Sequence, residues 1–118
     1  MKTSELQGAA LDWAVHIAQG LSEEDFVIVD SLYGPQWRGP EYSTSWQEGG
    51  PIIEREGIEL SPFTDSTSNG PIRLWVATRY ERFAMCEEHG PTPLVAAMRC
   101  FVATHLGNDV EVPEEFLA

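Results

Sequence analysis

The chain has 118 residues, of which 42% are hydrophobic, and its seven Lys and Arg against nineteen Asp and Glu give a formal net charge of −12. This length holds one core, so residues 1–118 are expected to form a single domain. The acidic excess repels phosphate backbones and anionic membranes, which disfavours direct binding to nucleic acid or to a membrane.

The first predicted element is a helix over Ser4–Gln19. Ser4 and Gln7 fit a capping box, and the apolar residues that follow recur at helical spacing up to Gly20. Asp12 and His16 fall on one polar face of this helix. The amino terminus lacks an apolar signal core, and no run approaches the ~20 apolar residues that cross a bilayer, so a cytoplasmic protein is expected.

The run Phe26–Val29 is short and β-branched, which predicts a buried strand. Residues 31–51 then form a predicted long loop rich in Gly and Pro that also contains Trp37, Tyr42 and Trp46. Loops of this length in compact domains are usually functional or disordered, and the aromatic residues argue against disorder.

The segment Pro51–Glu56 fits either a short helix opened by proline or an extended piece. A short strand over Ile58–Leu60 and a turn-rich loop over Ser61–Gly70 are expected to follow. Ile72–Glu81 is the longest strand candidate. Its Ile72, Leu74, Val76 and Tyr80 are expected to face the helices, and the opposite face is expected to present Arg73, Trp75 and Arg79.

The segment Thr92–Gly107 carries start and stop signals for one helix. Thr92 is the expected N-cap, Pro93 occupies the first helical position, and Gly107 closes the last turn. Apolar residues cover more than one stripe of this helix, so it is predicted to be central. Val110–Val112 is a further candidate to extend the sheet.

These elements predict an α+β fold: one small domain whose short antiparallel sheet, of about three to five strands, is covered by an N-terminal and a C-terminal helix. Both Cys86 and Cys100 are expected to be reduced, because two cysteines make no disulfide framework.

Three segments carry a resemblance to a known family. They are Glu5–Val15 with Gly8-Ala9-Ala10-Leu11-Asp12-Trp13, Tyr42–Ile58 with Tyr42-Ser43-Thr44-Ser45-Trp46 and Gly49-Gly50-Pro51, and Gly90–Glu115 with Gly90-Pro91-Thr92-Pro93-Leu94. On these residues the chain resembles the NinX-like phage and prophage proteins, a family of unknown function. The resemblance implies a phage-encoded accessory protein acting in a bacterial host, and it supplies no catalytic residue.

No catalytic constellation is visible. The three histidines lie far apart in sequence, Cys86-x-x-His89 is only half of a metal site, and no phosphate-binding loop is present. We therefore expect a protein without enzyme activity, cofactor or metal.

A small anionic or nucleotide-like ligand is the preferred binding hypothesis. Its expected site residues are Tyr42 and Trp46 for stacking, Arg55 and Arg79 for charge, and Thr92 at a helix start that presents free amides. Each also has a structural explanation, namely loop anchoring, salt bridges to the Glu54–Glu56 segment, and helix capping. A semi-buried Arg99 is expected to pair with Glu54 or Glu56. A bound nucleotide would suit sequestration of a host defence signal.

The alternative is a protein partner. Acidic groups concentrate at Glu23–Asp25, Glu54–Glu59, Glu87-Glu88 and Asp109–Glu115, and on one shared face they would imitate DNA toward a basic host protein. A homodimer that shares the apolar surface of the predicted Thr92–Gly107 helix is a third hypothesis.

Overall fold

The computed structural model describes residues 1–32, 34–82 and 84–117. In chain order its helices and strands are α1 (Gly8–Ala18), β1 (Val27–Ser31), β2 (Gly34–Arg38), α2 (Trp46–Glu56), β3 (Glu59–Thr67), β4 (Gly70–Glu81), β5 (Ala84–Gly90) and α3 (Pro93–Leu106). Short 3₁₀ turns lie at Thr3–Glu5, Glu23–Asp25 and Glu114–Phe116. The expected α+β class is confirmed.

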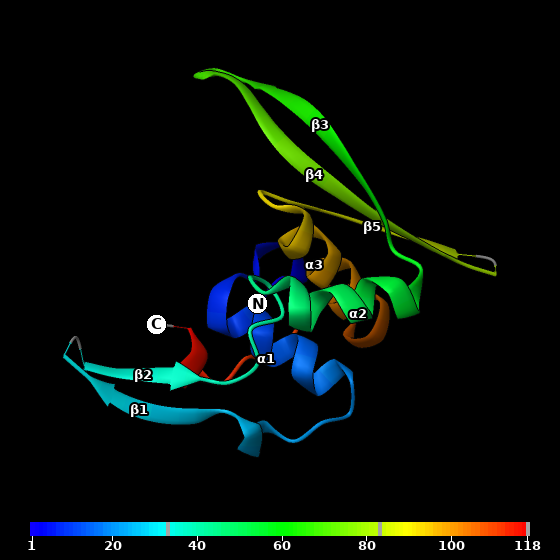
Figure 1. Ribbon diagram of the computed structural model, residues 1–118. Helices are drawn as coiled ribbons and strands as arrows, with labels where there is room; N and C mark the ends of the chain where they lie inside the picture. Colours follow the sequence, from blue (N-terminus) through cyan, green and yellow to red (C-terminus); the bar gives the residue numbers. More distant parts are fainter. Residues whose placement is uncertain (33, 83, 118) are drawn as a thin grey trace.

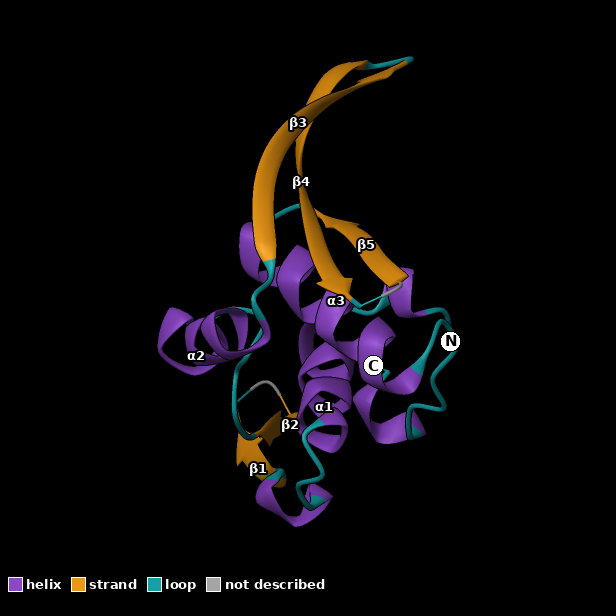
Figure 2. Ribbon diagram, turned by 90° about the vertical axis from the view of Figure 1, so that its right-hand side faces the viewer, coloured by secondary structure: helices purple, strands orange, loops and turns teal. Residues whose placement is uncertain are grey.

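Three layers make up the body of the molecule. The antiparallel β3-β4-β5 sheet lies on one side of α3, and α1 packs against the other side of α3 (Figure 1). The sheet therefore meets α3 directly, and α1 contributes from behind it. The separate β1-β2 hairpin lies at the far end of the molecule from the β3-β4 hairpin, which projects beyond the helices (Figure 2).

Helix α3 forms as predicted, and it is the centre of the core. Thr92 Oγ1 accepts the Val95 N–H at 3.1 Å, Pro93 opens the helix, and Gly107 follows it at φ +88°. The stretch from Leu94 to Met98 and the stretch from Cys100 to Val102 are buried. Gly90, where the chain turns from β5 toward α3, allows close approach, because a Cβ there would lie 2.7 Å from the Ala96 nitrogen.

Helix α1 begins later than expected. Thr3–Glu5 forms a separate 3₁₀ turn, and Gly8 opens α1 in a left-handed conformation at φ +57°, so the predicted capping box from Ser4 is wrong. The first residues are held instead by the other end of the chain: Thr3 donates from its backbone N–H to the Asn108 carbonyl at 2.9 Å. Val110 pairs there too, through its N–H to the Met1 carbonyl at 2.9 Å, and not with the sheet.

The predicted loop over 31–51 contains regular structure. β2 pairs with β1 in register from Val27 opposite Arg38 to Ser31 opposite Gly34, and α2 begins at Trp46. Val27 is 51% exposed, so the expectation of a fully buried strand there is wrong. The helical alternative for Pro51–Glu56 is correct, and the helix extends a further turn toward the N-terminus, where the carboxylate of Glu48 accepts the Glu41 N–H.

Two predictions about the sheet are wrong. The Ser61–Gly70 segment is mostly strand, because β3 continues to Thr67 and pairs with β4 along its whole length. The face of β4 that meets α3 is also the opposite of the one predicted. Ala77 is fully buried there and Trp75 packs on the core, whereas Ile72 is 46% and Tyr80 63% exposed.

Candidate functional site

The most distinctive surface is the side of the β3-β4-β5 sheet that faces away from α3, which we call the open face. Strand register places on it the apolar side chains of Phe63, Ile72, Leu74, Val76, Tyr80 and Met85. Tyr80, Met85 and Ile72 are 63%, 56% and 46% exposed, and the other three are half-buried. In the described residues, α3 is the helix that makes extensive contact with this sheet, and it does so from the other side (Figure 2).

Large contiguous apolar patches are rare on monomeric proteins and mark interaction surfaces. The open face also has a definite charge. Register puts Glu59, Asp65 and Glu87 among the apolar side chains, and no Lys or Arg of the described strand residues points to this side. Among the described residues of this face His89 is the one titratable base. Its ring centroid lies 5.0 Å from that of Phe63, and its Nε2 lies 3.3 Å from Glu87 Oε2. The surface is thus apolar with an acidic surround.

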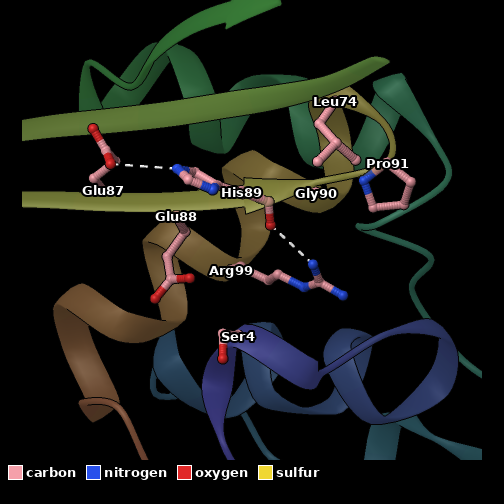
Figure 3. Close-up of a pocket in the computed structure, with 8 residues that line it drawn as sticks. All are labelled: Ser4, Leu74, Glu87, Glu88, His89, Gly90, Pro91 and Arg99. Atoms are coloured by element: carbon pink, nitrogen blue, oxygen red, sulfur yellow. Dashed lines mark hydrogen bonds and ion pairs between the residues drawn. The ribbon is translucent and has the colours of Figure 1, made fainter. Parts of the chain in front are cut away.

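At the end of β5 the surface is hollowed by a pocket of about 310 Å³ (Figure 3). Arg99 of α3 reaches into it, and Ser4 faces it from the 3₁₀ turn at the N-terminus (Figure 3). The guanidinium donates from Nε to the Leu6 carbonyl and from Nη1 to the His89 carbonyl, both at 2.8 Å. Arg99 therefore does not pair with Glu54 or Glu56, and that expectation is wrong. Glu88, on the α3 side of β5, is its nearest electrostatic partner.

Tyr42 and Trp46 do not form a stacking pair. Tyr42 is buried, and its hydroxyl lies 2.7 Å from His16 Nδ1, whose Nε2 lies 2.8 Å from Asp25 Oδ2. Burial raises the pKa of Tyr42 above its usual range. Trp46 stands 56% exposed at the start of α2. The side chain of Trp37, the third aromatic residue named in the predicted loop, lies outside the described part of the structure.

Arg55 and Arg79 are brought together, at the carboxylate of Glu56. Arg79 donates from Nε to the Glu56 carbonyl at 3.2 Å, lies 3.6 Å from its carboxylate through Nη2, and pairs with Glu81. Arg55 Nε donates to Glu56 at 3.4 Å, and His105 Nε2 lies 2.9 Å from the same carboxylate. Burial of Glu56 opposes ionisation, but the hydrogen bonds from His105 and Arg55 hold its pKa below the ordinary value. These cations are matched by carboxylates, so the cluster ties α2, β4 and α3 together.

Thr92 is the N-cap of α3, as expected, and its hydroxyl accepts a hydrogen bond from the Val95 N–H. The five predicted site residues therefore divide among separate places in the fold: Tyr42 in the core, Trp46 on α2, Arg55 and Arg79 at Glu56, and Thr92 at the start of α3. They do not converge on one pocket.

The sequence did not predict that a polar group on α1 is buried. Asp12, expected on a polar helix surface, is only 7% exposed and accepts the Ser43 N–H at 2.8 Å. Burial raises the pKa of Asp12 to about 6, against the opposing effect of the hydrogen bond from the Ser43 N–H. His16 is buried beside it, so both side chains anchor the segment before α2. The sequence signal was their spacing of four, which also fits a solvent-exposed face.

Cys86 and Cys100 are both free thiols, in agreement with the reduced state expected for them. Burial raises the pKa of Cys100 to about 12, which makes it a poor nucleophile. Within residues 1–32, 34–82 and 84–117 no three His, Cys, Asp or Glu side chains converge to hold a metal ion. Cys86 and His89 are three apart on one strand, so they point to opposite faces of the sheet.

The fold and these surfaces define a small acidic α+β protein whose sheet is covered on one face and open on the other. The family model described as Bacteriophage P22, NinX matches residues 2–105, so the chain belongs to this phage family and is a phage accessory protein. No curated protein matches the chain. In the described residues, no helix is both long and apolar enough to span a bilayer.

Proposed function

We propose that this phage protein is a noncatalytic binding protein that docks a basic host protein on its open face in the cytoplasm. The observation that carries the proposal is the apolar surface of Ile72, Tyr80 and Met85, which stays exposed on the face of the sheet opposite the one that packs on α3. Exposed apolar area of this kind stabilises a complex by roughly 25 cal/mol per Å² removed from water, less the costs of association.

The acidic residues of the open face favour a basic partner over a second copy of the chain. A second copy would bring Glu59, Asp65 and Glu87 against their own counterparts, between two chains that each carry −12. Like charges placed opposite one another across an interface are costly, whereas a partner with Lys or Arg around an apolar patch would complement this surface. By covering such a basic patch, this protein would keep the partner from binding DNA. That inhibitory role agrees with its acidic charge.

For the preferred hypothesis of a nucleotide-like ligand, Tyr42 offers no stacking surface, because it is buried and its hydroxyl lies 2.7 Å from His16. Trp46 is exposed but stands at the start of α2, whereas Arg79 lies at the other end of this helix. A second candidate function, binding of a small ligand with an anionic group, is favoured by one observation. Arg99 lines a hollow, and among the described residues its guanidinium is bonded only to backbone carbonyls.

The docking proposal is tested with a pair of variants that each add one negative charge to the β3-β4 hairpin. Ile72→Asp places the charge on the open face, and Thr64→Asp places it on the opposite face of the same hairpin. A photoreactive amino acid at position 72, compared with one at position 64, is then used to crosslink partners in host lysate. We expect one discrete basic protein to be crosslinked from position 72. The crosslinked product should disappear when the chain also carries Tyr80→Asp, and its yield should fall at ~0.5 M NaCl.

With purified partner, Ile72→Asp should abolish binding while Thr64→Asp retains it. Equal binding of the two variants, or a partner insensitive to salt, would contradict the proposal. Analytical ultracentrifugation of the protein alone tests the competing possibility of a homodimer. A dimer that Ile72→Asp dissociates would show that the open face is occupied by a second copy instead.

A further inference from the structure

The hollow at the end of β5 combines a cation, a carboxylate and a hydroxyl that the fold itself leaves incompletely used. Its walls come from three parts of the chain: the strand end with Glu88, the helix with Arg99, and the N-terminal turn with Ser4 (Figure 3). Its volume of about 310 Å³ accommodates a small metabolite. The hollow adjoins the open face, because Leu74, Glu87 and His89 line it as well. Its charged groups Glu88 and Arg99 lie on the α3 side of the sheet, away from Ile72, Tyr80 and Met85, so binding there is argued apart from the docking proposal.

Arg99 is held in place without being neutralised. A guanidinium has five N–H donors, and here Nε and Nη1 donate to the carbonyls of Leu6 and His89. No carboxylate of the described residues lies within ion-pair distance of it. The two carbonyl bonds fix the plane of the guanidinium, and the donors that remain are ready for a bidentate contact with a carboxylate. Because the side chain is half-buried, an anion that pairs with it would be bound more strongly than at an exposed arginine.

Glu88 is the complementary group. Its side chain is half-buried on the same side of β5, and none of the hydrogen bonds or ion pairs of the described residues uses its carboxylate. Burial raises the pKa of Glu88, and the charges of Arg99 and His89 oppose this effect only in part. Such a group accepts strongly from an ammonium.

We infer that this hollow binds a small zwitterion of the α-amino acid class, with its carboxylate on Arg99 and its ammonium on Glu88. The acidic pair Glu87 and Glu88 disfavours a phosphate, because a dianion would meet two negative charges at the rim. A ligand that carries both charges satisfies Arg99 and Glu88 at once and leaves the net charge of the site unchanged.

The test uses three probes of matched size: glycine, acetate and methylammonium. Each is titrated into isotopically labelled protein, and the amide signals of residues around Gly90 and Ser4 are followed by NMR. We expect glycine to shift these signals with an affinity about tenfold higher than acetate or methylammonium. Inorganic phosphate is the anion control and should bind more weakly than glycine.

Glu88→Gln is the decisive variant, because it leaves Arg99 and its carbonyl contacts intact. It should weaken glycine binding about tenfold while acetate binding stays the same or improves. Arg99→Lys should weaken both ligands, and Arg55→Lys, an exposed arginine on α2 that does not line the hollow, should change neither. The inference is overturned if acetate or phosphate binds wild type as tightly as glycine, if Glu88→Gln leaves the preference for glycine unchanged, or if glycine shifts no signal at this site.

Discussion

At the scale of single residues, Asp12 is the clearest case of a side chain whose chemistry depends on burial. Its pKa rises from 3.8 to about 6, so the folded state binds a proton more tightly than the unfolded state does. The stability associated with this group is therefore fully present below about pH 4 and is lost as the pH rises through about 6. At neutral pH the loss amounts to roughly 2 to 3 kcal/mol.

We therefore expect Asp12→Asn to be more stable than wild type at pH 7, by up to about 2 kcal/mol, and equal to it near pH 4. The asparagine oxygen can still accept the Ser43 N–H, whereas Asp12→Ala removes that acceptor and should destabilise the protein at every pH. Urea unfolding of the three proteins between pH 4 and pH 7 measures the differences. A constant difference between Asp12→Asn and wild type over this range would show that the carboxyl titrates normally.

At the scale of elements, α2 contains two adjacent glycines with opposite roles. A Cβ at Gly49 would lie 2.3 Å from the Tyr42 carbonyl oxygen and 2.7 Å from Leu94, whereas at Gly50 the nearest atom is 3.9 Å away. Gly49→Ala should destabilise the protein by roughly 1 to 3 kcal/mol, because the backbone at Tyr42 must move. Gly50→Ala should stabilise it by about 0.5 to 1 kcal/mol, because alanine is favoured in a helix interior. Thermal unfolding compares the two. Equal shifts would mean that α2 does not pack closely on the Tyr42 segment.

The elements also show where sequence reasoning succeeds and where it stops. Helix α3 was predictable in full, because Thr92, Pro93 and Gly107 act within one segment. The orientation of β4 was not, because alternation identifies two faces without saying which one a helix covers. Contact with α3 decides it: Ala77 and Trp75 lie on the inner face, and Ile72 and Tyr80 lie on the outer face.

The candidate sites were less predictable than the fold. Arg79 and Arg55 meet at Glu56 only because β4, α2 and α3 converge there. Likewise the start of α1 depends on contacts of Thr3 with residues more than one hundred positions away, which no local pattern reveals. What the apolar pattern of β4 did reveal was a surface to be covered. In the docking proposal a partner covers it.

At the scale of the whole molecule, the excess of twelve negative charges has opposite consequences for the fold and for the complex that we propose. Within the chain, like charges repel one another more strongly in the compact state than in the unfolded state, so added salt should stabilise the fold by screening them. Between the chain and a basic partner the attraction is screened in the same way, so added salt should weaken binding.

We therefore expect the midpoint of urea unfolding to rise between ~0.02 M and ~0.2 M NaCl, while the affinity for the partner captured at position 72 falls over the same range. The two measurements on one preparation separate a loss of binding caused by screening from a loss caused by unfolding. Glu59→Gln, which removes one charge from the open face, should reduce the salt dependence of binding more than Glu115→Gln, which removes one from the chain end away from that face. If both variants reduce it equally, the attraction comes from net charge alone and the open face does not direct the contact.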